Sequence, residues 1–496
     1  MISFLRRALI GVATGCLCAS VFAAPPRGTL LSGPTLVPIN LPGGASIDTM
    51  EPSVLRTILQ RAQHGVLMPI AGDPHCNITV YSIRYQTIGG RGEPTDASGV
   101  IMVPGSNDKL CVGPRPVLLY AHGTSLDRNY SMSQLKGEAR LVAAMFVAQG
   151  FIVVAPDYAG YGGSSLPYHP YLNGQQQSAD MMDALRAARS AFAHAGTQAG
   201  PQLFLSGYSQ GGYVAVATQR AMQAQHSDEF KVTAAAGLSG PYALLQMSDG
   251  IFAGKPNTGI TAYLPLLTTA GQKSGAVLYT SPADLYESRY AGEIENLLPG
   301  TERVDDLIKK GKLPAGALFA RDSQPQGEGA SSYFADLNLV RSSYRATYLQ
   351  DVAAHPCDVD PAAPLDCDVG NGLRAWMRKN DLRNFTPHSA LMLCGGKRDP
   401  VVPFFNATAA NAYFRAQGAT PQLVELESPL PAGQEPYPAI KRSFAQALEH
   451  ARTEAVGEGR DPNKAILDLY HGRLVAQYCF MAAREFFQQF SQQHAR

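Results

Sequence analysis

The chain has 496 residues, a formal net charge of +1 and 16% charged residues. So balanced a charge argues against a nucleic-acid partner or an acidic partner surface. The 45% hydrophobic content supports a large core, as in a globular protein.

Residues 1–24 resemble a secretory signal peptide. Arg6 and Arg7 supply the positive start, residues 8–22 are largely apolar, and small residues precede the expected cleavage point. The apolar stretch is too short for a membrane-spanning helix, which needs about 20 apolar residues. A lipoprotein site at Cys16 is disfavoured because the apolar run before it is short. We therefore expect an exported mature chain, periplasmic or secreted, without an integral membrane segment.

Export to an oxidising compartment favours disulfides among the six cysteines that follow the signal. Pairing by neighbourhood predicts Cys76–Cys111, Cys357–Cys367 and Cys394–Cys479. A free buried thiol is the alternative for any one of them. No C-x-x-C or H-x-x-x-H pair occurs, so neither a metal site nor a cofactor is predicted.

The first part of the mature chain predicts an extended start and then a hairpin. Residues 25–50 are rich in Pro and Gly, and residues 53–63 are compatible with a short helix. Residues 78–87 alternate in polarity as a strand does, and residues 97–104 follow as its partner across a Gly-rich turn.

From residue 117 onward, predicted strands and helices alternate. This alternation favours a parallel sheet with helices on both faces, the α/β class. The predicted strands are 117–121, 151–155, 203–206 and 232–238, and the predicted helices are 140–149 and 176–194.

The alternation stops between residues 242 and 387, where Gly and Pro are frequent and no clear strand is present. It resumes with strands at 389–396 and 422–426 and a last helix at 474–490. We therefore expect residues 25–241 and 388–496 to form one core, with residues 242–387 inserted as a mainly helical cap or lid. The helices predicted inside this insertion are 283–290, 304–310 and 333–344.

The sequence Gly207-Tyr208-Ser209-Gln210-Gly211 directly follows the apolar run of a predicted strand. This G-x-S-x-G pattern between a strand and a helix is typical of a nucleophile elbow, in which the serine occupies a strained turn. A side chain at either glycine would collide with the neighbouring strand or helix. Ser209 is therefore the candidate nucleophile.

A serine hydroxyl becomes a good nucleophile only beside a base that is itself oriented by a carboxylate. In α/β-hydrolases these residues follow in the order Ser, Asp, His. Asp399 lies in a glycine turn after the strand that ends near Cys394, and it is the candidate acid. A purely turn-forming Asp before Pro is the alternative for Asp399. Asp381 and Asp468 are weaker rivals because neither follows an apolar strand.

Three histidines follow Asp399 in the chain. His471 is placed by the sequence in a loop just before the last helix, from which a base can reach the serine. His450 falls inside a predicted helix at 439–452, and His494 lies at the chain end. His471 is therefore the candidate base, and His450 stays open because the stretch from Asp399 to His471 is long.

The oxyanion of an acyl-transfer reaction needs two backbone N–H donors. The N–H of Gln210, the residue after the nucleophile, is one candidate. The second is the N–H of Thr124, in the His122-Gly123-Thr124 turn after the first strand of the alternating region. His122 is expected to support this turn. The predicted Cys394–Cys479 bridge would tie the Asp399 turn to the His471 segment.

These motifs together resemble the α/β-hydrolase superfamily and, within it, secreted lipases and esterases of the lipase A type and their bacterial relatives. The resemblance implies an α/β-hydrolase fold with a cap before the acid. It also implies hydrolysis of a carboxylic ester, from a small molecule or a lipid, through a serine acyl-enzyme. A polyester or polyhydroxyalkanoate depolymerase is the alternative; a serine peptidase or a non-catalytic binding protein ranks lower. The sequence predicts neither acyl-chain preference nor oligomeric state.

Overall fold

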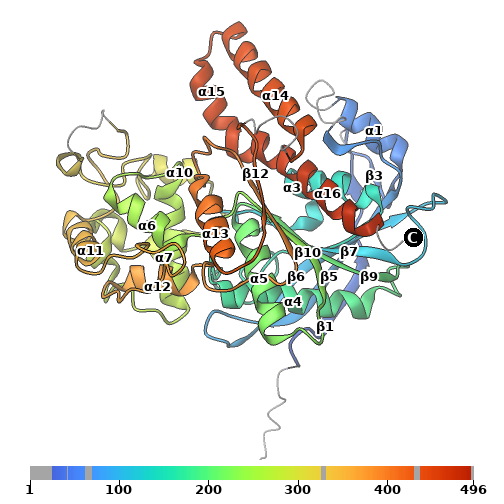
Figure 1. Cartoon of the computed structure of the whole chain (residues 1–496), viewed down its shortest axis with the longest axis horizontal. Helices are drawn as coiled ribbons and strands as arrows, with labels where there is room; N and C mark the ends of the chain where they lie inside the picture. The colour runs from blue at the N-terminus through green and yellow to red at the C-terminus, as the bar shows by residue number, and fades with distance from the viewer. Residues whose placement is uncertain (1–24, 42, 62–69, 326–330, 429–435, 493–496) are drawn as a thin grey trace, which may run out of the picture.

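The computed structural model describes residues 25–41, 43–61, 70–325, 331–428 and 436–492. The signal predicted at residues 1–24 lies outside them. A ten-stranded sheet crosses the molecule in the order β1-β5-β6-β8-β7-β9-β10-β11-β12, with β4 paired to β5 (Figure 1). Its strands are β1 Leu30–Leu36, β4 Thr49–Met50, β5 Asn77–Ile88, β6 Pro94–Gly105, β7 Arg115–Ala121, β8 Ile152–Pro156, β9 Ala199–Tyr208, β10 Val232–Leu238, β11 Ala390–Gly395 and β12 Gln422–Glu425.

The sheet is parallel from β8 to β12 and antiparallel from β1 to β8. The predicted hairpin is the pair β5 and β6, and the Pro-rich start contributes β1 and β4 at the antiparallel end. A separate short sheet pairs β2 (Ile39–Asn40) with β3 (Ser46–Ile47). The central strands are apolar along their length because both faces of the sheet are covered.

Helices cover both faces of the sheet. One buried apolar cluster contains α4 (Gly174–Ala191) and α5 (Gln210–Gln225), and a second contains α1 (Pro52–Arg61), α3 (Glu138–Met145) and α16 (Ala476–Gln492). This arrangement confirms the α/β class. The remaining helices of the core are α13 Phe405–Ala416, α14 Pro438–Gly457 and α15 Pro462–Leu469, of which α14 and α15 project together at the top of Figure 1.

The segment between β10 and β11 is helical, and its described residues form only isolated bridges and no strand. It lies beside the sheet, at the left of Figure 1. The predicted helix at 333–344 is wrong over its first part, because Phe334 instead packs on Phe319, with ring centroids 5.5 Å apart. Its helices are α6 Leu244–Ala253, α7 Ile260–Lys273, α8 Pro282–Leu285, α9 Ser288–Ala291, α10 Val304–Lys309, α11 Ser342–Ala354 and α12 Gly372–Asn380.

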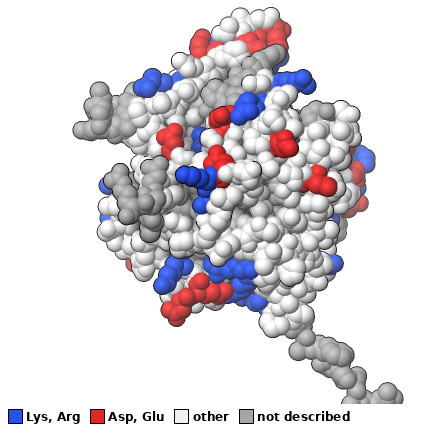
Figure 2. All heavy atoms as spheres, turned by 90° about the vertical axis from the view of Figure 1, so that its right-hand side faces the viewer, with Lys and Arg blue, Asp and Glu red and all other residues white. Residues whose placement is uncertain are grey.

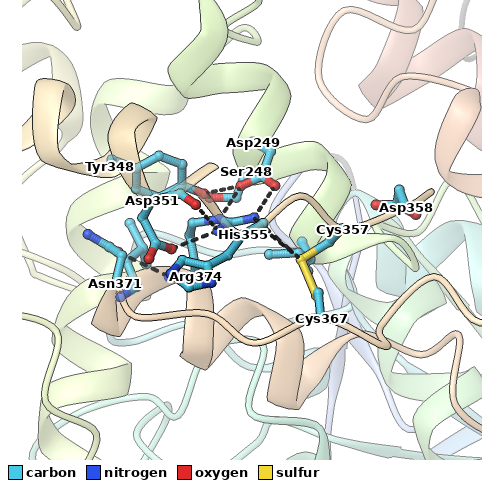
Figure 3. Close-up of polar contacts among 12 residues, drawn as sticks. Ser248, Asp249, Tyr348, Asp351, His355, Cys357, Asp358, Cys367, Asn371 and Arg374 are labelled. Carbon is cyan, nitrogen blue, oxygen red and sulfur yellow. Dashed lines mark hydrogen bonds and ion pairs between the residues drawn. A yellow bond between two sulfur atoms is a disulfide. The ribbon is translucent and has the colours of Figure 1, made fainter. Parts of the chain in front are cut away.

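A fully buried arginine joins three of these helices (Figure 3). Arg374 of α12 contacts Asp249 of α6 through Nε and Nη2, both at 3.0 Å, and Asp351 of α11 through Nη1 at 2.6 Å. Tyr348 of α11 donates its hydroxyl to the same Asp249 at 2.7 Å. Two carboxylates therefore share a single cation in the interior of the segment, and the tyrosine hydroxyl donates to one of these carboxylates.

Charged side chains of both signs are interspersed on the face shown in Figure 2, separated by wide uncharged areas. Among the described residues, no helix is long and apolar enough to cross a membrane.

Candidate active site

Ser209 lies in the turn between β9 and α5. The strand ends at Tyr208 and the helix begins at Gln210, so Ser209 makes the turn with a φ of 57°. A positive φ is uncommon for any residue other than glycine, and it turns the serine side chain out of the sheet.

The glycines of the motif are explained by close backbone contacts. A Cβ on Gly211 would lie 1.9 Å from the carbonyl oxygen of Ala121, at the end of β7. A Cβ on Gly207 would lie 2.4 Å from the same oxygen. Only glycine fits at either position, because β7, β9 and α5 converge under the serine.

Asp399 follows β11 and is buried. Its Oδ1 accepts hydrogen bonds from the backbone N–H groups of Val401 and Val402, at 2.9 and 3.0 Å. Its Oδ2 accepts the Ser239 hydroxyl at 3.0 Å and faces His471 Nδ1 at 2.7 Å. The same carboxylate therefore stabilises its own turn and orients the histidine.

His471 joins the serine to the aspartate. Its Nε2 lies 2.9 Å from Ser209 Oγ, and its Nδ1 faces Asp399. The expectation of a loop is wrong, because His471 belongs to the π-helical stretch η6 (Tyr470–Val475), which links α15 to α16 without a break. The hydroxyl of Tyr208 donates to the His471 carbonyl, so the strand before the serine also holds the histidine backbone.

The rival residues have other partners. Asp381 is paired with Arg383, and Asp468 with Lys464. His450 lies on α14 and lines a groove with α16 that does not contain Ser209. Of the histidines and acids weighed in the sequence, the structure brings only His471 and Asp399 to the serine. His494 lies outside the described residues.

The turn after β7, at residues 122–124, also lies close to Ser209. A Cβ on Gly123 would lie 3.7 Å from Ser209 Cβ. Two surface cavities contain Ser209, and Thr124 lines both of them. Gln210 begins α5, so its N–H is one of the unpaired donors at a helix N-terminus. Both predicted donor residues are therefore beside Ser209.

His122 supports this turn as expected. Its Nδ1 faces the carbonyl oxygen of Gly123 at 2.6 Å, and its Nε2 faces that of Asp157 at 3.1 Å. Burial lowers the pKa of His122 to about 4. The ring is therefore neutral near pH 7 and donates to one of the two carbonyls.

Ser209 lines two neighbouring cavities. The narrow cavity, about 70 Å³, runs toward the helical segment and is apolar. The wide groove, about 720 Å³, opens beside His471 and carries charged groups. The narrow cavity is lined largely by Leu244, Met247, Ile251, Ile260, Tyr263, Leu264, Leu267, Leu373 and Met377. The polar groups of the wide groove include Glu138, Arg140, Arg473 and Gln477.

The structure contains three disulfides, and they join the pairs expected from the sequence: Cys76–Cys111, Cys357–Cys367 and Cys394–Cys479. Cys394 belongs to the strand that precedes the Asp399 turn, and Cys479 to the helix that follows His471. The third bridge thus connects the two segments that carry the acid and the histidine.

Sequence reasoning missed two polar side chains at this site. Ser239 follows β10 and donates to Asp399. Glu138 begins α3 and accepts the N–H of Gly123 at 3.0 Å. Neither residue carries a local pattern that would single it out. The parallel order of the strands could have indicated Ser239, since it follows the strand next to the one that ends before Asp399.

A family model described as "Secretory lipase" matches residues 127–262. Among solved structures, a ligand-bound form of the rice cell wall degrading esterase LipA from Xanthomonas oryzae is 28% identical, with a TM-score of 0.64 over 81% of this chain and 91% of that chain.

The chain has the α/β-hydrolase fold and is similar to secretory lipases and esterases. Two further structures share the fold at lower identity. A putative hydrolase from Legionella pneumophila is 20% identical over 94% of this chain and 99% of that one, with a TM-score of 0.66. Lipase A from Candida antarctica, in its closed state, is 10% identical over 88% and 83%, with a TM-score of 0.50. No curated protein matches this chain.

Proposed function

We propose that the protein is an exported serine carboxylic-ester hydrolase that works through an acyl-enzyme. The observation that carries this proposal is the hydrogen-bonded chain from Ser209 Oγ to His471 Nε2, 2.9 Å, and from His471 Nδ1 to Asp399 Oδ2, 2.7 Å. The three disulfides support an oxidising compartment, either the periplasm or the extracellular space.

In the first half of the reaction, Ser209 Oγ attacks the ester carbonyl carbon while His471 Nε2 takes the hydroxyl proton. Asp399 stabilises the imidazolium that forms. The carbonyl oxygen becomes an oxyanion, which the N–H groups of Gln210 and Thr124 hold. His471 then gives its proton to the departing alcohol oxygen as the carbon–oxygen bond breaks, leaving an acyl group on Ser209.

In the second half, water replaces the alcohol. His471 takes a proton from the water, whose oxygen attacks the acyl carbon. The tetrahedral intermediate collapses, the proton returns to Ser209 Oγ, and the carboxylic acid leaves. Preorganised donors such as the two N–H groups are typically worth about 2.7–4 kcal/mol each in the transition state.

The helical segment 242–387 acts, in this proposal, as a cap that binds the acyl part of the ester. The narrow cavity between Ser209 and helices α6, α7 and α12 is apolar, which suits an alkyl chain. Its volume of about 70 Å³ favours a slim, unbranched chain over a bulky acid.

The proposal is tested by labelling with a fluorophosphonate, which phosphonylates activated serines. We expect one equivalent of label on the peptide that contains Ser209, with parallel loss of p-nitrophenyl ester hydrolysis. The Ser209→Ala variant is the control and stays unlabelled. Labelling elsewhere, or a labelled protein that still turns over ester, would refute the proposal. Polyester films and peptide anilides complete the substrate panel and test the depolymerase and peptidase alternatives.

Leu264→Phe is expected to shorten the acyl chain that the protein accepts. Leu264 lies on α7 and lines the narrow cavity. Each buried methylene is worth about 0.8 kcal/mol, so excluding two or three of them lowers kcat/KM about 10- to 50-fold. We expect this loss with p-nitrophenyl octanoate and little change with the acetate ester.

Val277→Phe is the matched control, because Val277 belongs to the same helical segment but is 78% exposed and outside the cavity. This variant should leave the ratio of the kcat/KM values for the octanoate and acetate esters unchanged. Equal losses on both esters in the Leu264 variant would show that the cavity does not hold the acyl chain.

A further inference from the structure

Glu138 is a titratable side chain at the active site with no part in the reaction described above. It lines the wide groove together with Ser209 and His471. Its Oε1 accepts the backbone N–H of Gly123 at 3.0 Å and the hydroxyl of Tyr120, and its Oε2 lies 3.2 Å from the same N–H. The carboxyl group is therefore hydrogen-bonded to Gly123, the residue that immediately precedes Thr124.

We propose that Glu138 is a positioning residue for ester hydrolysis, whose ionised carboxylate holds the Gly123 N–H and so keeps the Thr124 N–H aimed at the oxyanion. This inference rests on the proposed function, because it assigns a role within the same site. Glu138 touches neither substrate nor reacting atoms in this scheme and acts through the turn.

The other contacts of the turn act on its carbonyl and hydroxyl groups. The Tyr158 hydroxyl donates to the His122 carbonyl at 3.0 Å, His122 Nδ1 faces the Gly123 carbonyl, and the Thr124 hydroxyl lies 3.2 Å from the Tyr171 hydroxyl. Glu138 is the partner of the Gly123 N–H itself. The Gly123 N–H and the Thr124 N–H belong to two successive planar peptide groups that join at the Gly123 Cα, so a shift of the first group displaces the point from which the second is directed. A displaced oxyanion donor stabilises the transition state poorly.

Burial affects the ionisation of the Glu138 carboxyl group. Desolvation raises the pKa of Glu138 to about 7, against the opposing effects of the Tyr120 hydroxyl, the Gly123 N–H and the nearby His471 side chain. Above pH 7 the carboxylate accepts both hydrogen bonds as an anion, and charge-assisted bonds are roughly twice as strong as neutral ones. Below pH 7 the protonated carboxyl holds the turn more weakly.

Among the described residues, no other carboxylate lines the groove that contains Glu138. The titratable or charged groups that face it or share its groove are Tyr120 of β7, Tyr208 of β9, His471 and Arg473 of η6, Arg140 of α3, and Tyr130 and Tyr158 from loops. Burial raises the pKa values of all four tyrosines, so they stay neutral near pH 7.

Glu138→Gln separates charge from shape, because its amide oxygen can still accept from Gly123 and Tyr120. The wild-type kcat/KM is expected to show an ionisation near pH 7 that the Glu138→Gln profile lacks. At pH 8 the variant should be about fivefold or more slower, reflecting a neutral in place of a charged hydrogen bond. Glu454→Gln, an exposed carboxyl on α14, is the control and should keep the wild-type profile.

Hydrogen exchange of the peptide that spans residues 120–126 gives a second readout that does not depend on turnover. We expect faster exchange in Glu138→Gln and Glu138→Ala, but not in Glu454→Gln. An unchanged pH profile in an active, folded Glu138→Gln protein would overturn the proposal, as would unchanged exchange. If the wild type hydrolyses no ester, the proposed function fails, whereas the exchange experiment still decides whether Glu138 holds the turn.

Discussion

Ser209→Ala is expected to lower kcat for ester hydrolysis by about 10⁴- to 10⁶-fold, because in the proposed mechanism it removes the atom that attacks the carbonyl. The oxyanion donors and the binding cavity remain, so a small residual rate above that of water should persist. The substitution removes one oxygen from a partly exposed side chain. We therefore expect little change in stability, which thermal unfolding would check beside the p-nitrophenyl ester assay.

The hydrogen-bonded chain of Ser209, His471 and Asp399 predicts that the losses of activity caused by substitutions within it are not additive. Ser209→Ala, His471→Ala and the double variant should have nearly the same residual rate, because each removes the same coordinated step. Ser190→Ala is the control and should retain full activity, because Ser190 lies on α4, donates its hydroxyl to the Ala187 carbonyl and lines neither cavity at Ser209. A double variant much slower than either single variant would mean that Ser209 and His471 act independently.

Arg374→Met is expected to destabilise the folded protein by about 3–5 kcal/mol, the typical cost of removing one partner from a buried ion pair. The Arg374 side chain is 0% exposed and contacts Asp249 and Asp351, which are themselves only 18% and 12% exposed. Methionine fills much of the space but leaves both carboxylates without their cation. Denaturant unfolding, followed by tryptophan fluorescence, would measure the loss, since Trp376 lies on the same helix.

Lys379→Met tests whether this loss comes from the buried charge. Lys379 belongs to α12 as well, but it is exposed, and its ammonium lies 5.7 Å from the centre of the Trp376 ring. A contact of this kind is worth about 0.5–1 kcal/mol. Equal destabilisation by the two substitutions would show that the Arg374 network contributes no more than an exposed cation does.

Much of the core could be predicted because its signals are local. The strands from β7 to β12 are short apolar runs separated by turns, and their alternation with helices follows directly from a sheet buried on both faces. The serine elbow was visible for the same reason, since its glycines are adjacent to Ser209 in the chain. The three disulfides join the cysteine pairs predicted by neighbourhood in the sequence. In each pair the two cysteines are separated by 85 residues or fewer.

Other features depend on groups that meet only in three dimensions. His471 was expected in a loop, but a loop and a π-helical stretch have no distinguishing composition over six residues. Residues 333–341 look helical in composition, yet contacts with Phe319 hold them in another conformation. The partners of Arg374 lie 125 and 23 residues away, so no spacing rule could have found them.

The sequence by itself determined the α/β class, the strained serine and the chain order of acid and base, because each follows from local backbone geometry or from the order of strands in the sheet. Only the tertiary structure decided between His471 and His450, placed Ser239 and Glu138 at the site, and formed the cavity beside Ser209. These choices depend on distances of a few ångströms between segments far apart in the chain, and such distances are set by packing of the whole core rather than by any local pattern.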